Sequence, residues 1–378
     1  MSDTDQISSD NPIKVMVVDD SAVVRGLTTR ILQDDECISV VASVGNGEMA
    51  VRNLPRQEVD VIVLDIEMPV MDGLTALPKL LEVEPTVQII MSSTLTSRNA
   101  EISIRALQAG AAEYIPKPTS SVDISQGGDF RRELHDKVFA LGLTRRKNLG
   151  PSHAKKPDKR AVKTPSPRSA LASSDQIKLR DSGTKKPTVL VVGSSTGGPQ
   201  ALLEFFKGLD SSLNMPVLIT QHMPPSFTAI LADHITKQTS WTCGEGKDGE
   251  PIQKGRVYLA PGDFHMLVEN KNGTPIIKLD QGPPENFCRP AVDPMLRSIA
   301  KCFGGNVMVV ILTGMGADGK KGGDLIIEAG GTMIAQDEAT SVVWGMPGAV
   351  ATGGLCSAVL PLKDLTPYVE NFISKGAP

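Results

Sequence analysis

The chain has 378 residues, of which 40% are hydrophobic and 22% charged, and its formal net charge is −4. This length allows two domains with separate cores, and this composition is typical of a globular protein rather than a disordered or fibrous one. No apolar run reaches the roughly eighteen residues of a membrane-spanning helix, so membrane insertion is not expected.

The N-terminal segment and the cysteines both favour a cytoplasmic protein. The first residues are polar and acidic, which argues against a secretory signal. The five cysteines are scattered along the chain and none lies in a CxxC pair. We therefore expect neither a disulfide framework nor a zinc site.

A first α/β domain is predicted over residues 13–143, after a disordered tail over 1–12. Apolar runs predict five strands, over 13–18, 38–43, 59–64, 87–91 and 113–115. Apolar residues at helical spacing predict a helix after each strand, the last over 129–141. Five strands alternating with five helices favour a doubly wound parallel sheet.

Residues 144–186 have the composition of a flexible linker, rich in proline and serine and without periodicity. From 145 to 187 there are thirteen Lys and Arg against three Asp, a local excess of ten. The rest of the chain therefore carries about −14. Nucleic-acid binding is an alternative for this basic tract, but it has neither aromatic residues for stacking nor an apolar helical stripe. We expect a solvated linker.

A second α/β domain is predicted over residues 187–378. Buried parallel strands are predicted over 189–192, 217–220, 307–312 and 332–335. Between 244 and 280, short alternating runs separated by Asn-Gly and Pro-Gly favour an antiparallel hairpin insert. These runs cover 256–260, 265–269 and 275–279.

Polar residues follow the strands of the first domain, where ligands bind in an open parallel sheet. They are Asp19, Asp20, Asp65, Ser92 and Lys117. Converging carboxylates are typical of a site for a hard divalent cation. A neighbouring hydroxyl and ammonium suit a phosphoryl group on one carboxylate. A single Asp after a strand is more often a helix cap, but five matching strand ends favour the binding site.

In the second domain, the glycine-rich turn 193–198 joins a predicted strand to a predicted helix, a setting that exposes a serine nucleophile at Ser195. His222 and Asp318 each follow another predicted strand, so the three side chains can meet at one sheet edge. A phosphate-binding turn is the alternative, although no Lys follows the glycines and a P-loop is excluded. Taken singly, His222 could be a loop histidine and Asp318 a helix cap.

The first domain resembles a response-regulator receiver domain. The motifs that carry the resemblance are Asp19-Asp20-Ser21, the run LDIEMPVMDG over 64–73, Ser92, Tyr114 and Lys117-Pro118. The resemblance implies a flavodoxin-like fold in which Asp65 accepts a phosphoryl group from a histidine kinase.

The same resemblance implies roles for the neighbouring residues. A Mg²⁺ ion would be held by Asp19, Asp20 and Asp65, with the backbone carbonyl of Glu67. Ser92 and Lys117 would contact the phosphoryl group, and Tyr114 would change rotamer as the switch.

The second domain resembles the catalytic domain of the CheB family, the chemotaxis protein-glutamate methylesterases. The motifs are STGG over 195–198, QHMPP over 221–225, RPAVD over 289–293 and LTGMGADG over 312–319. The resemblance implies a Rossmann-like domain in which Ser195 is the nucleophile, His222 the general base and acid, and Asp318 the orienting carboxylate. The backbone N–H groups of Thr196 and Met315 are our candidates for the oxyanion hole.

The implied activity is hydrolysis of glutamate methyl esters on chemoreceptors, with no cofactor for the ester reaction. The receiver would cover the catalytic face until phosphorylation weakens that packing. The family also deamidates certain receptor glutamines, which the sequence leaves open for this chain. The implied partners are chemoreceptors and a chemotaxis histidine kinase, without nucleic acid. The alternatives are a response regulator with a non-enzymatic or DNA-binding output, and an esterase for small soluble esters.

Overall fold

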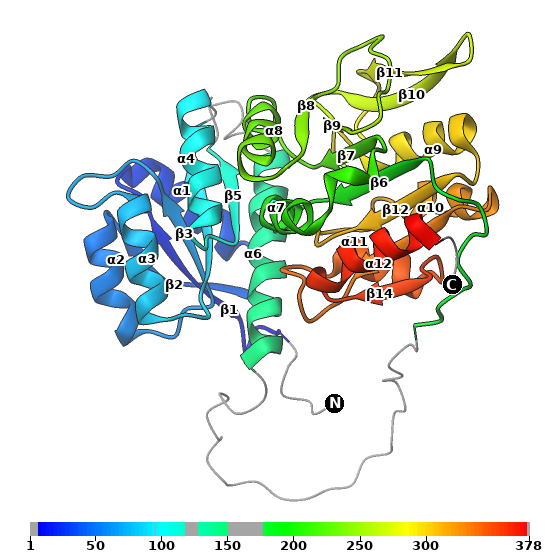
Figure 1. Cartoon of the computed structure of the whole chain (residues 1–378). Helices are drawn as coiled ribbons and strands as arrows, with labels where there is room; N and C mark the ends of the chain where they lie inside the picture. Colours follow the sequence, from blue (N-terminus) through cyan, green and yellow to red (C-terminus); the bar gives the residue numbers. More distant parts are fainter. Residues whose placement is uncertain (1–6, 95, 118–127, 150–176, 376–378) are drawn as a thin grey trace, which may run out of the picture.

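The computed structural model describes residues 7–94, 96–117, 128–149 and 177–375. Two α/β domains lie side by side, with the N-terminal domain on the left of Figure 1. The first half of the predicted tail, most of the predicted linker and Pro118 of the motif at 117–118 lie outside the described residues. Within them, no helix is long and apolar enough to cross a membrane.

The N-terminal domain is a parallel five-stranded sheet of order β2-β1-β3-β4-β5. Its strands are β1 (Ile13–Val18), β2 (Ile38–Val44), β3 (Val61–Asp65), β4 (Gln88–Ser93) and β5 (Glu113–Pro116). Its helices are α1 (Ala22–Gln33), α2 (Gly47–Asn53), α3 (Gly73–Val83), α4 (Ser97–Gln108) and α6 (Gly128–Leu149). The predicted alternation of five strands and five helices is confirmed.

Helix α6 is longer than the sequence predicts and continues to Leu149. Its last turns are held by the buried carboxylate of Asp60, which accepts from Arg145 Nη1 at 2.8 Å and from Arg146 Nη2 at 2.7 Å. The first basic residues of the predicted linker are therefore part of the helix, and the predicted boundary at 143 falls inside it.

The C-terminal domain is a parallel seven-stranded sheet of order β14-β13-β12-β6-β7-β9-β8. Its strands are β6 (Val189–Ser194), β7 (Val217–Gln221), β8 (Thr242–Glu245), β9 (Arg256–Leu259), β12 (Val307–Ile311), β13 (Thr332–Gln336) and β14 (Ala358–Leu360). Its helices are α7 (Gly198–Gly208), α8 (Phe227–Gln238), α9 (Val292–Phe303), α10 (Lys320–Glu328), α11 (Gly345–Thr352) and α12 (Leu362–Lys375). The predicted fold class, two doubly wound parallel sheets, is confirmed.

The predicted antiparallel hairpin insert is confirmed, but the run 256–260 does not belong to it, and the predicted start of the domain is also wrong. Only β10 (His265–Lys271) and β11 (Thr274–Asp280) form the antiparallel hairpin, because β9 pairs in parallel with β7 and β8 in the main sheet. Residues 257–259 are fully buried rather than alternately exposed, which fits a central strand. The domain also begins before 187, since Arg180 N donates to Cys356 O and Gly183 N donates to Thr332 Oγ1, both at 3.0 Å.

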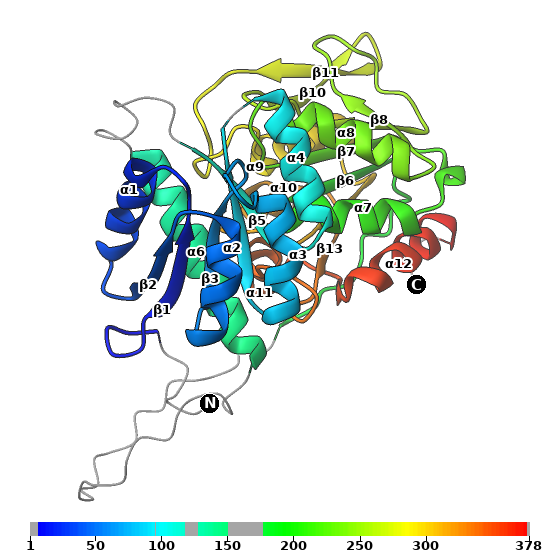
Figure 2. The ribbon, with the colours of Figure 1, turned by 90° about the vertical axis from the view of Figure 1, so that its left-hand side faces the viewer.

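The two domains pack closely through α4 and β5 on one side and α7 and α8 on the other (Figure 2). The ring of Tyr114 stacks on Phe227 with 4.5 Å between centroids and 13° between planes. Gln200 Nε2 donates to Leu107 O at 3.0 Å and to Ala111 O at 2.8 Å, across the domain boundary. Buried apolar side chains of both domains belong to one continuous cluster.

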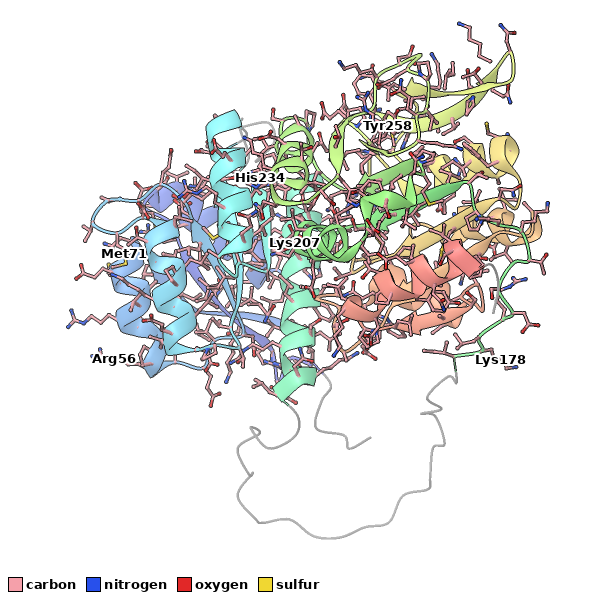
Figure 3. All side chains as sticks on the ribbon, viewed as in Figure 1. Arg56, Met71, Lys178, Lys207, His234 and Tyr258 are labelled. Carbon is pink, nitrogen blue, oxygen red and sulfur yellow. The ribbon has the colours of Figure 1, made fainter. Side chains whose placement is uncertain are left out.

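A smaller polar contact marks the rim of the same interface. Gln108 Nε2 lies 3.1 Å from Nδ1 of His234, which projects from α8 toward the N-terminal domain (Figure 3). Both side chains are solvent-accessible, so this contact contributes less than the buried ones.

Candidate active site

Ser195 stands on the turn between β6 and α7. Gly197 has a left-handed φ of 73°, and a Cβ there would lie 2.5 Å from Val342 Cγ2, so only glycine fits. Ser195 O accepts from Gly198 N at 2.7 Å and from Gln221 Nε2 at 2.9 Å. The turn is therefore fixed on both sides of the serine.

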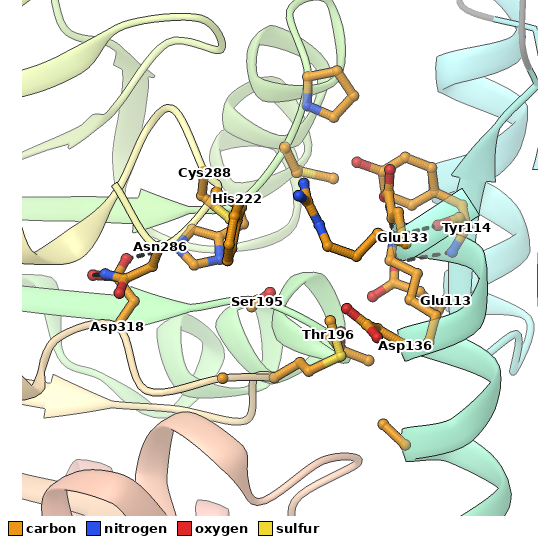
Figure 4. Close-up of a pocket in the computed structure, with 18 of the residues that line it drawn as sticks. Glu113, Tyr114, Glu133, Asp136, Ser195, Thr196, His222, Asn286, Cys288 and Asp318 are labelled. Carbon is orange, nitrogen blue, oxygen red and sulfur yellow. Dashed lines mark hydrogen bonds and ion pairs between the residues drawn. The ribbon is translucent and has the colours of Figure 1, made fainter. Parts of the chain in front are cut away.

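His222 and Asp318 follow the strands on either side of β6, namely β7 and β12. His222 Nε2 lies 2.8 Å from Asp318 Oδ2, and their side chains are 10% and 1% exposed. The predicted meeting of the imidazole and the carboxylate at one sheet edge is confirmed. Ser195 projects into the same pocket (Figure 4).

The pKa values of this pair are shifted in a way that favours an ion pair. Burial raises the pKa of Asp318, but the hydrogen bond to His222 and the N–H groups of Val292 and Asp293 outweigh it, so the net pKa is lowered. Burial lowers the pKa of His222, but Cys288 and Asp318 outweigh it and raise the pKa to about 10. In this closed arrangement the imidazole holds its proton at neutral pH.

The nucleophile and the imidazole are close neighbours without a direct bond. Among the described residues, no hydrogen bond joins Ser195 Oγ to His222, although both line one cavity of about 710 Å³. The three predicted residues thus lie around one cavity, with the His222–Asp318 contact formed and the Ser195–His222 hydrogen bond not formed.

Two backbone N–H groups face the same cavity. Within the described part of the chain, the N–H groups of Thr196 and Met315 donate to no protein acceptor, and both residues line the cavity. The loop after β12 approaches so closely that a Cβ on Gly314 would lie 2.9 Å from Ser195 Cβ. This pattern fits donors reserved for a developing oxyanion.

The N-terminal domain forms the opposite wall of the cavity. Glu113, Tyr114 and Glu133 face Ser195 and Thr196 across it (Figure 4). The Arg132 guanidinium lies 4.0 Å from the ring centroid of Phe287, at the mouth of the site. A large substrate cannot reach Ser195 unless this wall moves.

Sequence reasoning missed Asn286 and Cys288 in this cavity. Both lie on a loop in which Asn286 and Phe287 have left-handed backbone, with φ of 51° and 63°. The neighbouring RPAVD motif was a signal for this region, but local sequence does not predict that non-glycine residues adopt this conformation.

A second polar cluster lies at the carboxyl edge of the N-terminal sheet. Carboxylate oxygens of Asp19, Asp20 and Asp65 lie within 4.8 Å of one another. Lys117 Nζ pairs with Asp19 Oδ2 at 2.7 Å and with Asp65 Oδ1 at 2.8 Å. Ser92 is buried beside them, in register with Asp65. These predicted residues are brought together.

The electrostatics of this cluster depend on burial and on Lys117. Burial raises the pKa of Asp65 to about 6, although Lys117 opposes that shift. Burial lowers the pKa of Lys117, but its bonds to Asp19 and Asp65 outweigh it and the net pKa is raised. The converging carboxylate oxygens are a donor set that suits Mg²⁺, whereas the ammonium of Lys117 is not a ligand and suits a phosphoryl oxygen instead.

Two other predicted residues lie at the margins of this cluster or away from it. The side chain of Glu67 is exposed and shares a cavity of about 390 Å³ with Asp20 and Asp72. Tyr114 is 3% exposed and packs against Phe227, so it contacts the other domain rather than the carboxylates.

Comparison with known proteins identifies both domains. The family described as response regulator receiver domain matches residues 15–127, and the family described as CheB methylesterase matches residues 190–369. A protein-glutamate methylesterase/protein-glutamine glutaminase of Rhodospirillum centenum is 56% identical over 377 residues, with 97% of this chain and 95% of that protein covered. One from Azospirillum brasilense is 57% identical over 380 residues, with 97% and 94% covered.

A solved structure is also similar. The CheB methylesterase catalytic domain of Thermotoga maritima is 40% identical, covers 48% of this chain and 97% of its own, and has a TM-score of 0.48. The full-length relatives are named as enzymes, which does not favour a DNA-binding output. The chain belongs to the CheB family of protein-glutamate methylesterases/protein-glutamine glutaminases and carries a receiver domain ahead of its catalytic domain.

Proposed function

We propose that the chain hydrolyses glutamate γ-methyl esters on chemoreceptors and that phosphorylation of its receiver domain controls this reaction. The observation that carries the proposal is the buried His222–Asp318 pair beside Ser195 in one cavity, walled on its other side by the receiver. The names of relatives more than half identical in sequence support the substrate class.

The ester reaction follows from the roles of the triad. His222, in its neutral form, takes the proton of Ser195 Oγ as that oxygen attacks the ester carbonyl. The N–H groups of Thr196 and Met315 stabilise the oxyanion of the tetrahedral intermediate. His222 then gives the proton to the departing methoxide, and methanol leaves a γ-glutamyl ester on Ser195. Water, deprotonated by His222, attacks this ester and restores the receptor carboxylate and the free serine.

The same acyl-enzyme accounts for a glutaminase activity. A glutamine side chain differs from the methyl ester only in its leaving group, which departs as ammonia after protonation by His222. Both activities appear in the names of the relatives. We therefore propose that this chain also deamidates receptor glutamines.

Phosphorylation acts at Asp65. A histidine kinase supplies the phosphoryl group, and a Mg²⁺ ion, held by Asp19, Asp20 and Asp65 beside Glu67, would offset the negative charge of the phosphoryl oxygens. Ser92 and Lys117 then bond the phosphoryl group. Lys117 must release its bond to Asp65 or share it, and because Lys117 directly follows β5, this rearrangement lies next to the strand that carries Tyr114.

Tyr114 connects that change to the catalytic domain. Its ring is on β5, next to the strand that carries Ser92, and it stacks on Phe227 of α8. A rotamer change of Tyr114 removes this stack and weakens the closed interface. Activation is thus a shift in population from a closed to an open form.

The partners follow from this function. The substrate is the helical cytoplasmic region of a chemoreceptor, the phosphodonor is a chemotaxis kinase, and both place the chain in the cytoplasm. Nucleic acid has no role.

Methanol release from methylated receptor membranes, with and without acetyl phosphate and Mg²⁺, tests the proposal. We expect release from the wild-type chain to rise with the phosphodonor, no stimulation in Asp65→Asn, and almost no release from Ser195→Ala. Full methanol release by Ser195→Ala would show that the triad is wrong. If Asp65→Asn is still stimulated by the phosphodonor, the proposed regulation is wrong and the proposed ester hydrolysis still stands.

A further inference from the structure

A second buried carboxylate, that of Asp293, lies beside the triad and has no role in the proposed chemistry. It is 1% exposed and stands in the first turn of α9. Its Oδ1 accepts from Gly319 N at 3.0 Å and from Gly322 N at 2.7 Å. Its Oδ2 accepts from Asn286 Nδ2 at 3.0 Å.

The carboxylate of Asp318 is held in a complementary way. Its Oδ2 accepts from Val292 N at 2.6 Å in addition to its bond with His222. Its Oδ1 accepts from Asp293 N and Gly319 N at 3.0 Å and from Asn286 Nδ2 at 2.8 Å. Asn286 therefore bridges the two carboxylates.

The two helices exchange their N-terminal caps. Neither α9 nor α10 is capped by the side chain of its own N-cap residue, Ala291 or Gly319. Asp318, just before α10, bonds the first N–H groups of α9, and Asp293, inside α9, bonds the first N–H groups of α10. Both carboxylates thus lie where two positive helix ends meet.

This arrangement determines which oxygen Asp318 offers to the imidazole. Three donors occupy Oδ1, one backbone N–H holds Oδ2, and only Oδ2 faces His222. Rotation of the carboxylate would break several of these bonds at once. Asp293 fixes one donor directly, because it holds the Asn286 amide in the bridging position beside Asp318.

We infer that Asn286 and Asp293 are positioning residues of the esterase reaction, which lock the Asp318 carboxylate in the orientation that His222 requires. The inference rests on the proposed function only in that Asp318 is taken to orient His222. A purely structural reading gives Asp293 the cap of α10 and nothing more, so the test must separate the cap from the bridge.

The variant Asp293→Asn makes that separation. Its amide oxygen can still accept from Gly319 and Gly322, but its NH₂ group faces the NH₂ group of Asn286, and the bridge is lost. Asn286→Ala removes the bridge from the other end. Glu285→Gln is the matched control. Glu285 directly precedes Asn286, and its substitution weakens an ion pair with Arg297 but removes no hydrogen bond to Asp318.

We expect kcat for methanol release by the full chain with acetyl phosphate and Mg²⁺ to fall by ~10- to 100-fold in Asp293→Asn and Asn286→Ala. KM should stay close to the wild-type value in both variants, and Glu285→Gln should behave as wild type. Asn286→Ala should also have a lower Tm, because Ala disfavours the left-handed backbone and leaves the two carboxylates without their bridge, so Asp293→Asn is the cleaner variant. A wild-type kcat in Asp293→Asn would overturn the inference.

Double variants decide the case even if a single variant loses stability. In an Asp318→Ala background, Asn286→Ala and Asp293→Asn should have almost no further effect on the residual rate, because they act through Asp318. If each lowers that residual rate by the same factor as in the wild-type background, they act elsewhere and the inference fails.

Labelling of Ser195 separates this inference from the proposed substrate. The rate at which diisopropyl fluorophosphate phosphorylates Ser195, followed by mass spectrometry, depends on the triad and needs no receptor. If methanol is not released but labelling is slower in both variants, the proposed substrate is wrong and the positioning role stands. With acetyl phosphate and Mg²⁺ present to open the site, equal labelling rates in the variants and the wild-type chain refute the positioning role.

Discussion

The receiver cluster and the proposed esterase triad both place a buried aspartate at the carboxyl edge of a parallel sheet, yet the net pKa shifts of the two aspartates have opposite signs. Burial raises the pKa of Asp65 to about 6, although the ammonium of Lys117 and the N–H of Glu67 both act to lower it. Burial raises the pKa of Asp318 as well, but His222 and the N–H groups of Val292 and Asp293 outweigh this effect, so the net pKa is lowered.

The difference lies in what surrounds each carboxylate. Asp65 has other carboxylates as neighbours, which repel it and leave room for a cation and a phosphoryl group. Asp318 also has a neighbouring carboxylate, that of Asp293, but the imidazole of His222 and fixed backbone donors together keep Asp318 ionised. A covalently modified aspartate must stay accessible, whereas an orienting aspartate must not move.

The largest effect that would test this contrast is expected in Asp318→Asn. An amide in place of the carboxylate presents N–H groups to backbone donors and cannot hold His222 in the required tautomer, so kcat should fall by ~10⁴-fold. Methanol release with acetyl phosphate and Mg²⁺ measures it, and phosphorylation of Asp65 in the same sample is the control. A loss of less than tenfold would contradict the orienting role.

Removal of Lys117 tests the other half of the comparison. In Lys117→Met the repulsion among Asp19, Asp20 and Asp65 is no longer offset, and the phosphoryl group loses its ammonium partner. The ratio of stimulated to basal methanol release should fall to about one, because phosphorylation no longer distinguishes the two forms. The matched control Lys79→Met, on the exposed face of α3, should keep the wild-type ratio.

Substitution of Gln200 should weaken the closed interface between the two domains. Gln200→Ala removes two partly buried hydrogen bonds across the interface, and each contributes ~1 kcal/mol net. The Gln200 Oε1 atom has no partner within the described residues, so its loss costs nothing. We expect basal methanol release to rise about fivefold to thirtyfold, since the closed state loses ~1 to 2 kcal/mol of stabilisation.

Two observations accompany the Gln200 prediction. The rate at saturating acetyl phosphate should change little, because the open form lacks these bonds. Lys207→Ala, an exposed change on the same helix, should leave both rates as they are. An unchanged basal rate in Gln200→Ala would mean that this contact does not stabilise the closed form.

The smallest expected effect concerns Cys288, which helps raise the pKa of His222. The imidazole accepts a proton only when neutral, so a raised pKa lowers the rate at neutral pH. In Cys288→Ser the pKa of His222 should fall, the acid limb of the pH profile of kcat/KM should move to lower pH, and the rate at pH 7 should rise roughly twofold to fivefold. Cys302→Ser, on α9 and outside the cavity, is the control. A limb that moves to higher pH would contradict the prediction.

Sequence was sufficient wherever a buried apolar run ends at a polar residue. The strands before Asp65, Ser195 and Asp318 were predictable because side chains buried on both faces leave a continuous hydrophobic run. Once these strands are parallel, the residues after them must meet at one edge, which is why His222 and Asp318 could be paired without a structure.

Sequence was insufficient where a contact joins distant segments. The extra turns of α6 depend on Asp60, which lies about 85 positions before Arg145. Strand β9 joins the main sheet because its neighbours bury it, although its own pattern resembles a hairpin strand. The position of Asn286 depends on a left-handed backbone at Asn286 and Phe287, which cannot be predicted where the sequence has no glycine.

The exchanged caps of α9 and α10 also bear on how this catalytic site can be redesigned. Because each helix relies on a carboxylate from the other, neither helix can be shortened, replaced or permuted without loss of a cap on its neighbour. A Ser-His-Asp triad copied onto another parallel sheet as three side chains would lack this support. The smallest transferable unit is the helix pair together with the loop that carries Asn286.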